Sequence, residues 1–387
     1  MKYLVIGAGG TGGSIGAYMT EAGKDVTLIA RGEHLRKMQE RGLKMETTKK
    51  GTYNVNPIKA TDMEHYEDQP DVIFVCVKGY SLDETIPFIR RVAKKTAIVI
   101  PVLNIYGTGG RMQEQLPGLL VTDGCIYIAG EIKEPGTILM RGDIFRIVYG
   151  VRDPQELRPE LFEVAKDLKD SGIEGVLSDN IRRDALQKFA FVSPMAACGL
   201  YYHVSAGDVQ KTGDPRDTFV KLMREIDALA VAMEVPFLVD IVTTNLQILD
   251  TLNPEATTSM QRDVYAGKAS EIDGLIYEVV RMGERYGVPV PTYRMVAEMA
   301  EKKGLRWQAG PITLQNGEKM ADTEKKFKEK YLAGEIEFEE IDDYSQEWGF
   351  SDEPVTLREY LGLNAEEEDA WVSIGDEALQ EMLDRQR

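Results

Sequence analysis

The chain has 387 residues, of which 43% are hydrophobic, so it is long enough to form two or three domains with apolar cores. Its formal net charge of −18 argues against nucleic acid or an anionic membrane as a partner, and no apolar run approaches the roughly 20 residues of a membrane span. No secretory signal pattern precedes the first strand, and Cys76, Cys125 and Cys198 match no zinc spacing, so we expect a soluble, cytoplasmic protein without a metal site.

The start of the chain predicts a βαβ unit. Residues 2–6 have the pattern of a short buried strand, and residues 7–13 form a glycine-rich turn. Residues 14–23 then have the pattern of a helix that ends at a glycine. Residues 25–30 predict the second strand.

More strands alternate with helix-like segments further along the chain. Residues 71–77 and 96–103 are the clearest of these strands, and the alternation predicts a parallel, doubly wound sheet of the α/β Rossmann type. Residues 125–129 and 143–150 predict two further strands, added antiparallel at an edge. We assign residues 1–179 to an NADP-binding Rossmann domain.

After about residue 180 the pattern becomes helical. Apolar residues recur at spacings of three and four, which gives each segment one apolar face. These segments are residues 181–202, 216–233, 271–286 and 292–303. We therefore predict an all-helical second domain over residues 180–300, which would carry the substrate site.

Residues 301–387 differ from the rest of the chain. They hold 23 acidic and 11 basic residues together with all three tryptophans, a content of aromatic residues too high for a fully disordered tail. We expect an irregular C-terminal extension that wraps on the main body, with short helices near 355–361 and 376–385, and not a compact independent domain. The alternating stretch 335–340 predicts a half-buried extended segment, and the acidic run 366–369 should stay in water.

The strongest motif is a G-x-G-x-x-G loop that directly follows a strand and opens a helix, which is the context of a dinucleotide-binding turn. Gly7 permits the tight turn, Gly9 lets the backbone approach a pyrophosphate, and Gly12 lets the helix pack close to the sheet. The free N–H groups of the helix N-terminus would then face the phosphates. The loop consists of Gly7, Ala8, Gly9, Gly10, Thr11 and Gly12.

Arg31 follows the second strand, where enzymes that use NAD usually carry Asp or Glu for the ribose 2′-hydroxyl. A guanidinium group at this position can pair bidentately with a 2′-phosphate. The sequence therefore predicts NADPH/NADP as the cofactor, although Arg31 could also be an ordinary surface arginine, and nearby Arg36 and Lys37 fit either interpretation.

With these pieces in order, the chain resembles the ketopantoate reductase family over about residues 1–300. The glycine loop is common to many families, whereas the later pieces are more specific in combination. The pieces are the Gly7–Gly12 loop, Arg31, Val77-Lys78, Asn104, Lys188 and the run Ser259-Met260…Asp263…Glu271-Ile272-Asp273.

The resemblance implies reduction of a small 2-oxo acid, ketopantoate, to the 2-hydroxy acid by NADPH, in pantothenate biosynthesis. It implies that Lys188 is the general acid, and its apolar neighbours predict partial burial. Glu271 would orient the lysine or bind the cofactor and the substrate hydroxyl. Ser259 would bind the substrate carboxylate, unless it is an ordinary helix cap. Lys78 and Asn104 would contact the cofactor, and Asn104 also the substrate.

The chain departs from the family pattern at three positions. Family members specific for ketopantoate carry asparagines four and eight positions after the lysine, where this chain has Val192 and Ala196. The Glu-Ile-Asp motif is usually followed by a large residue, and here by Gly274. These changes agree with the same hydride chemistry on a more apolar 2-oxo acid.

Two alternatives remain open at this point. One is an opine-type or other imine-reducing dehydrogenase, which also pairs a Rossmann domain with a helical one. The other is a non-catalytic sensor that binds NADPH and uses its acidic tail to contact a partner. The Lys188 and Glu271 pair weighs against the sensor. A homodimer is compatible with the sequence.

Overall fold

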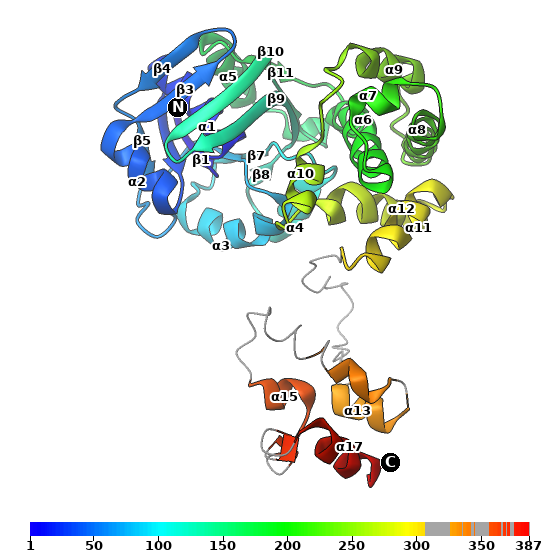
Figure 1. Ribbon diagram of the computed structural model, residues 1–387. Helices are drawn as coiled ribbons and strands as arrows, with labels where there is room; N and C mark the ends of the chain where they lie inside the picture. Colours follow the sequence, from blue (N-terminus) through cyan, green and yellow to red (C-terminus); the bar gives the residue numbers. More distant parts are fainter. Residues whose placement is uncertain are drawn as a thin grey trace. The chain divides into compact units, whose positions relative to one another are not determined.

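Figure 1 shows the computed structural model of the chain, with the strands of the first part in blue to teal and the helices of the second part in green to yellow. Two compact units are present, residues 1–311 and residues 312–387. The residues that the structure describes are 1–305, 326–334, 336–341, 344, 356–364, 367–368, 370–371 and 375–386.

A six-stranded sheet forms the centre of the first part, and all of its neighbouring strands pair in parallel. In spatial order the strands are β5 (Lys59–Thr61), β2 (Asp25–Ile29), β1 (Lys2–Ile6), β6 (Val72–Val75), β7 (Ile98–Pro101) and β8 (Leu120–Val121). The chain winds outward from β1 in both directions, so the predicted doubly wound Rossmann sheet is confirmed.

Apolar side chains on both faces of this sheet explain why it is buried. In β1, Tyr3 and Val5 join one apolar cluster, and Leu4 and Ile6 join another, because successive side chains point to opposite faces. The first cluster packs against α1 (Gly10–Glu21) and α5 (Pro159–Asp170), and the second against α3 (Leu82–Val92) and α4 (Thr108–Gln115). Helix α1 begins four residues before the predicted start at residue 14, so the glycine loop itself opens the helix.

A second sheet lies on the other side of α1, and here the sequence prediction was incomplete. Its long antiparallel hairpin, β9 (Asp123–Glu134) and β10 (Thr137–Gly150), contains the two predicted strands, but it does not extend an edge of the central sheet. Strand β10 pairs in parallel with β3 and β11 instead, and β3 pairs antiparallel with β4. In this second sheet the strands not predicted are β3 (Leu43–Thr47), β4 (Gly51–Val55) and β11 (Glu174–Leu177), and β5 and β8 of the central sheet were not predicted either.

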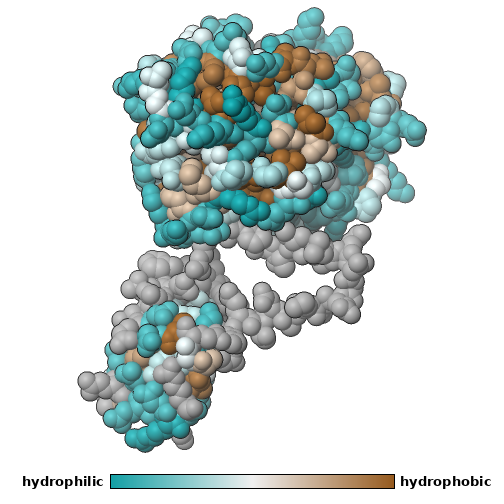
Figure 2. Space-filling view, turned by 90° about the vertical axis from the view of Figure 1, so that its right-hand side faces the viewer, coloured by the Kyte–Doolittle hydropathy of each residue, from teal (hydrophilic) through white to brown (hydrophobic). Residues whose placement is uncertain are grey.

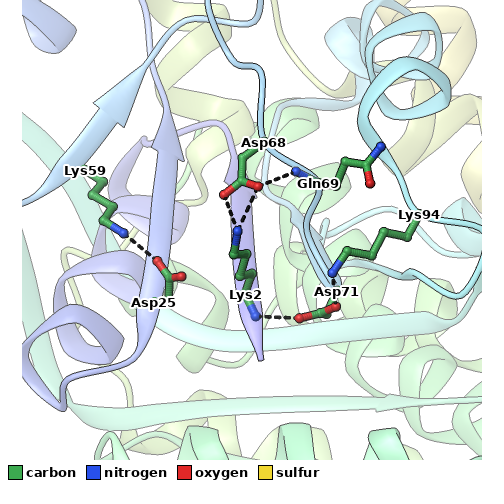
Figure 3. A network of polar contacts seen from close by, with 7 residues as sticks. All are labelled: Lys2, Asp25, Lys59, Asp68, Gln69, Asp71 and Lys94. Atoms are coloured by element: carbon green, nitrogen blue, oxygen red, sulfur yellow. Dashed lines mark hydrogen bonds and ion pairs between the residues drawn. The ribbon is translucent and has the colours of Figure 1, made fainter.

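The amino ends of the parallel strands are covered by a network of charged side chains (Figure 3). Lys2 lies at the start of β1. Its ammonium group is 2.8 Å from the carboxylate of Asp68, and the backbone N–H of Lys2 donates to the carboxylate of Asp71. Lys59 pairs with Asp25 across β5 and β2 at 2.7 Å. Exposed pairs of this kind contribute little to stability. Their position leaves the opposite, carboxyl edge of the sheet for ligands.

Helices account for residues 181–302, as predicted. The long helix α6 (Ile181–Tyr202) contacts α8, α9, α10 and α12, and it also contacts β9 and β10 of the Rossmann part. A π-helical turn, Asp273–Tyr277, precedes α11 in the segment that was predicted as one regular helix. The other helices are α7 (Ala206–Gln210), α8 (Asp214–Ala232), α9 (Ile241–Thr251), α10 (Ser259–Tyr265), α11 (Glu278–Tyr286) and α12 (Pro291–Lys302).

The face of the molecule on the side of these helices carries several apolar areas, which Figure 2 shows in brown. Four large apolar side chains that are exposed in this part of the chain lie between α8 and α9 or on these helices, namely Val231, Leu238, Val239 and Ile248. Within the described part of the chain, no helix has the length and hydropathy needed to cross a membrane.

The C-terminal unit has a core of its own, which corrects the prediction of an irregular wrapped segment. Its described helices are α13 (Phe327–Leu332), α15 (Leu357–Leu361) and α17 (Asp376–Asp384), so both predicted short helices are confirmed. The stretch predicted to be extended contains a 3-10 turn, Phe338–Glu340. The core residues are Phe327, Tyr331, Phe338, Ile341, Leu361, Leu363, Leu379 and Leu383. Trp371 packs against this core, and Trp307 and Trp348 lie outside the described residues.

Within this unit Glu367 also corrects the prediction that the run 366–369 stays in water, because its side chain is fully buried. Lys328 lies 2.6 Å from its carboxylate, and Gln386 and the backbone N–H of Asn364 each donate to it at 2.8 Å. Burial alone would raise the pKa of Glu367, but these donors outweigh it and lower the pKa. A buried carboxylate is tolerated here because its oxygen atoms have partners.

Candidate functional site

The glycine loop turns sharply between β1 and α1. Gly7 has a positive φ of 95°, a backbone conformation that is strained for any residue with a side chain. The N–H groups of Gly7 and Ala8 both donate to the carbonyl oxygen of Ile29, at 3.2 and 2.9 Å. The loop is therefore held against the end of β2, next to the position of Arg31.

The remaining glycines of the loop have different reasons to lack a side chain. A Cβ on Gly12 would lie 2.2 Å from the carbonyl oxygen of Gly7, so only glycine lets α1 approach β1 this closely. A Cβ on Gly10 would lie 2.3 Å from the backbone of Gly130 in β9. By contrast, nothing lies within 4 Å of a Cβ on Gly9, so the backbone there faces open space that a phosphate group could enter.

Arg31 is the N-terminal cap residue of α2 (Gly32–Arg41), and its side chain is exposed. It forms no ion pair with any other described residue, whereas Arg36 on the same helix pairs with Glu33 and Glu40. Lys37 also lies near these two carboxylates, at 3.8 and 3.5 Å. The guanidinium of Arg31 is thus available to an external anion at the end of β2, while the neighbouring cations are already neutralised.

Three charged side chains meet beyond the carboxyl end of β6. The ammonium group of Lys78 lies 3.0 Å from Asp263 and 3.1 Å from Glu271, and the backbone N–H of Gly79 donates to Glu271 at 3.2 Å. The carboxylate of Glu271 is only 3% exposed, whereas Lys78 and Asp263 are half-buried. Burial by itself lowers the pKa of Lys78, but the negative charges of Glu271 and Asp263 outweigh it and raise the pKa.

Lys188 on α6 has a neutral partner instead. Its ammonium group donates a hydrogen bond of 2.7 Å to the amide oxygen of Asn104, which follows β7, and it lies 5.6 Å from the ring centre of Tyr127 in β9. Burial lowers the pKa of Lys188, and the neighbouring Cys125 and Glu271 side chains oppose this shift without cancelling it. The partial burial predicted from the sequence is confirmed, since the residue as a whole is half-buried.

Ile105 connects the two lysine clusters, which are Lys78 with its two carboxylates and Lys188 with Asn104. Its side chain occupies the space between Gly79 and Gly274, where an added Cβ would lie 2.2 and 2.4 Å from Ile105 Cδ1. Gly274 belongs to the π-helical turn two residues after Ile272, and Gly79 holds Glu271 by a backbone hydrogen bond. The large residue that the family usually has at position 274 is thus replaced here by a glycine that accommodates Ile105.

Ser259 is the first residue of α10, and Thr258 is the cap residue, with its hydroxyl accepting from the backbone N–H of Gln261. The alternative interpretation of Ser259 as the cap is therefore wrong. Residues four apart share one face of a helix, so Ser259 lies on the face of α10 that carries Asp263. Within the described residues its hydroxyl has no hydrogen-bond partner, which leaves it free for a ligand.

The two positions at which the family has asparagines differ from each other. Val192, one turn beyond Lys188 on α6, is half-buried, while Ala196 is fully buried in the core of the helical part. Ala196 therefore has no surface with which to contact a substrate, and only Val192 can take part in the site.

Sequence reasoning missed three contributions to the site. Asp263 was noted only as part of a motif, although it pairs with Lys78 185 residues away. Tyr127 was not considered, because nothing local in a strand signals a contact with α6. His34 was not among the predicted site residues, yet its ring contacts the glycine loop. Its place in the first turn after Arg31 was the available signal.

Two family models match the chain. The model described as ketopantoate reductase PanE/ApbA matches residues 3–154, and the model of the C-terminal part of the same family matches residues 180–304. An uncharacterized oxidoreductase of Bacillus subtilis, YkpB, is 27% identical over 304 residues, which are 76% of this chain and 96% of that protein. Residues 305–387 lie beyond both family models.

Solved structures share the fold. The 2-dehydropantoate 2-reductase from Methylococcus capsulatus matches with a TM-score of 0.72 and 22% identity, over 80% of this chain and 99% of that one. A D-mandelate dehydrogenase solved with NADH and anilino(oxo)acetate matches with a TM-score of 0.71 and 22% identity, over 78% and 98% of the two chains.

Proposed function

Because the chain belongs to the ketopantoate reductase family of oxidoreductases, we propose that it reduces a small 2-oxo acid to the 2-hydroxy acid with NADPH. The observation that carries this proposal is the pair formed by Lys188 and Asn104, in which a half-buried lysine donates to a neutral amide oxygen at the carboxyl edge of the sheet. A proton donor at this edge, beside a dinucleotide loop, is what the reduction of a ketone requires.

The residues of the loop fit a nicotinamide dinucleotide. Gly9 leaves its backbone open to a pyrophosphate, the N-terminus of α1 points its free N–H groups to the same place, and Arg31 is available for a 2′-phosphate. When bound, the cofactor supplies the hydride. Lys78 would hold it together with Asn104, and the carboxylate of Glu271 keeps Lys78 in place.

Lys188 is the proposed general acid. Reduction leaves negative charge on the carbonyl oxygen of the substrate, and the ammonium group both stabilises that charge and donates a proton to it. The lowered pKa of Lys188 makes the proton easier to release than that of an exposed lysine. Asn104 orients the ammonium group by accepting one of its three N–H bonds, and Ser259 would donate to the substrate carboxylate.

The choice of substrate follows from the surroundings of Lys188. Val192 presents methyl groups on the same face of α6, where an asparagine would offer hydrogen bonds. We infer a substrate side chain that is more apolar than that of ketopantoate. The likeness to a D-mandelate dehydrogenase makes an aromatic 2-oxo acid such as phenylglyoxylate a reasonable member of the test set.

Oxidation of NADPH and of NADH, measured with a panel of 2-oxo acids, tests this function. The panel should contain ketopantoate, branched aliphatic 2-oxo acids and phenylglyoxylate, each with and without an added amino acid. We expect turnover with the 2-oxo acid alone and with NADPH preferred. Turnover only when an amino acid is present would identify an imine-reducing dehydrogenase, and dinucleotide binding without turnover on any substrate would identify a sensor.

We further propose that the protein is a homodimer, on the basis of the exposed apolar side chains of Val231, Leu238, Val239 and Ile248. Light scattering coupled to size-exclusion chromatography should give twice the mass of the chain, 43.3 kDa. A Leu238→Glu variant should shift the equilibrium to the monomer if this surface forms the interface. A monomeric wild-type protein at micromolar concentration would exclude the proposal.

A further inference from the structure

His34 connects three segments that surround the glycine loop. It lies in the first turn of α2, three residues after Arg31, and its Nε2 atom is 2.9 Å from the carbonyl oxygen of Ala8 in the loop. Its Nδ1 atom is 3.0 Å from the backbone nitrogen of Gly136, in the turn between β9 and β10. One side chain thus bridges the loop, the helix that carries Arg31, and the hairpin.

The two contacts determine the protonation state of the ring. The backbone N–H of Gly136 can only donate, so Nδ1 must accept with a free lone pair. The carbonyl oxygen of Ala8 can only accept, so Nε2 must carry the hydrogen. Both bonds exist only for the neutral ring with its proton on Nε2, and burial lowers the pKa of His34, which favours this form.

The hairpin that His34 reaches is itself in contact with the proposed active site. Gly130 of β9 packs against Gly10 at the start of α1, and Tyr127 of the same strand lies near Lys188. At its turn, Arg41 of α2 donates to the carbonyl oxygen of Pro135 at 3.0 Å. The hairpin therefore packs along one side of the glycine loop. His34 connects the hairpin to the loop at the end where α2 begins.

We propose that His34 is a positioning residue for the dinucleotide: it fixes the glycine loop relative to Arg31, and so fixes the distance between the pyrophosphate and the 2′-phosphate subsites. The two subsites belong to different segments, the loop after β1 and the cap of α2, which are otherwise joined near this point by the bonds of the loop to Ile29. A cofactor that bridges both subsites binds best when their spacing is set in advance. This inference rests on the proposed use of NADPH.

The test compares three variants of the full-length protein. His34→Leu removes both hydrogen bonds, and His34→Gln keeps a donor and an acceptor in one neutral side chain. His65→Gln is the matched control, because His65 is exposed and its side chain pairs with nearby Asp62 and with no other described residue. NADPH dissociation constants are measured by titration of the cofactor fluorescence. The values of kcat and of KM for NADPH are measured with the 2-oxo acid at a saturating concentration. Melting temperatures show that each variant is folded.

We expect His34→Leu to weaken NADPH binding about tenfold, which corresponds to about 1.4 kcal/mol, with kcat changed less than twofold. His34→Gln should recover most of the affinity, and His65→Gln should match the wild type. Without cofactor, hydrogen exchange of the segment around Gly136 should be faster in His34→Leu only.

Two results would overturn the role of His34. One is wild-type affinity for NADPH in His34→Leu, and the other is an equal loss of affinity in His34→Gln, which would point to the shape of the ring instead of its hydrogen bonds. A wild-type protein that binds neither NADPH nor NADH would be a different outcome, because it would refute the proposed function itself.

Discussion

Two lysines at the same edge of the sheet are held in opposite ways. Lys78, after β6, lies between the carboxylates of Asp263 and Glu271, and its pKa is raised. Lys188, on α6, has the amide oxygen of Asn104 as its only hydrogen-bond partner among the described residues, and its pKa is lowered. A lysine between two carboxylates keeps its proton and acts as a fixed cation. A half-buried lysine with a neutral partner and a lowered pKa can release its proton more easily, which is the property of a general acid.

The largest effect should come from removing the lysine with the lowered pKa. Lys188→Ala should lower kcat by about 10²–10⁴-fold, the usual contribution of general acid catalysis, while NADPH binding changes little. Steady-state kinetics and fluorescence titration of the cofactor measure the two quantities. Near-normal turnover in this variant would remove Lys188 from the mechanism. Lys166→Ala, on the exposed surface of α5, is the matched control.

Removing Lys78 should mainly lower the stability of the folded protein. Lys78→Met leaves the buried Glu271 without its cation, and breaking a buried pair costs about 3–5 kcal/mol; because Lys78 is 36% exposed, we expect a smaller loss, of about 1–3 kcal/mol. Urea denaturation measures it. In a double-mutant cycle, Glu271→Gln should recover part of the loss. Additive effects of Lys78→Met and Glu271→Gln would show that the pair is not coupled.

Arg31 extends the comparison to a cation without a partner in the described structure. Arg31→Asp should weaken the binding of NADPH but not that of NADH. The variant loses a charge-assisted hydrogen bond, which contributes about 1.5–3 kcal/mol, and it places a carboxylate opposite the 2′-phosphate. The ratio of kcat/KM for the two cofactors should therefore change about tenfold or more. Arg36→Asp is the control, since Arg36 is already paired with Glu33 and Glu40. Equal use of NADH and NADPH by the wild type would contradict this role.

The smallest effect should come from the contact that joins the two lysine clusters. Gly274→Ala places a methyl group 2.4 Å from Ile105 Cδ1, and overpacking of this kind costs about 1 kcal/mol when the neighbour can change rotamer. The melting temperature should fall by a few degrees and recover in Gly274→Ala combined with Ile105→Val or Ile105→Ala. No recovery in either double variant would mean that Ile105 does not transmit the strain.

The sequence predicted the parts of the site that depend on local backbone geometry. The glycine loop and Arg31 follow from the order of strand, turn and helix, and β1 and β2 lie where their apolar runs placed them. Lys188 and Glu271 came from the family resemblance. The structure brings both to one edge, with Asn104 and Lys78, because β6 and β7 are neighbours in the sheet.

What could not be predicted depends on contacts distant in sequence. Asp263 and Lys78 are paired because the fold places α10 next to the carboxyl edge of the sheet, and no local sequence pattern indicates this pairing. The pairing of β10 with β3 is also non-local, so the hairpin was placed at an edge of the wrong sheet. Glu367 was predicted to be exposed from its acidic neighbours, but a lysine 39 residues earlier provides its counter-charge.

The opposite tuning of the two lysines is tested most directly by the pH dependence of a single turnover. The rate of 2-oxo acid reduction at saturating NADPH is measured for the wild type, Lys188→Gln and Lys78→Gln. A general acid works only while protonated, so the wild-type rate should fall as the pH rises through the pKa of Lys188, below the ordinary lysine value of 10.5. This alkaline limb should persist in Lys78→Gln and be absent from the residual rate of Lys188→Gln. The same limb in Lys188→Gln, or its loss in Lys78→Gln, would contradict the assignment of Lys188 as the acid.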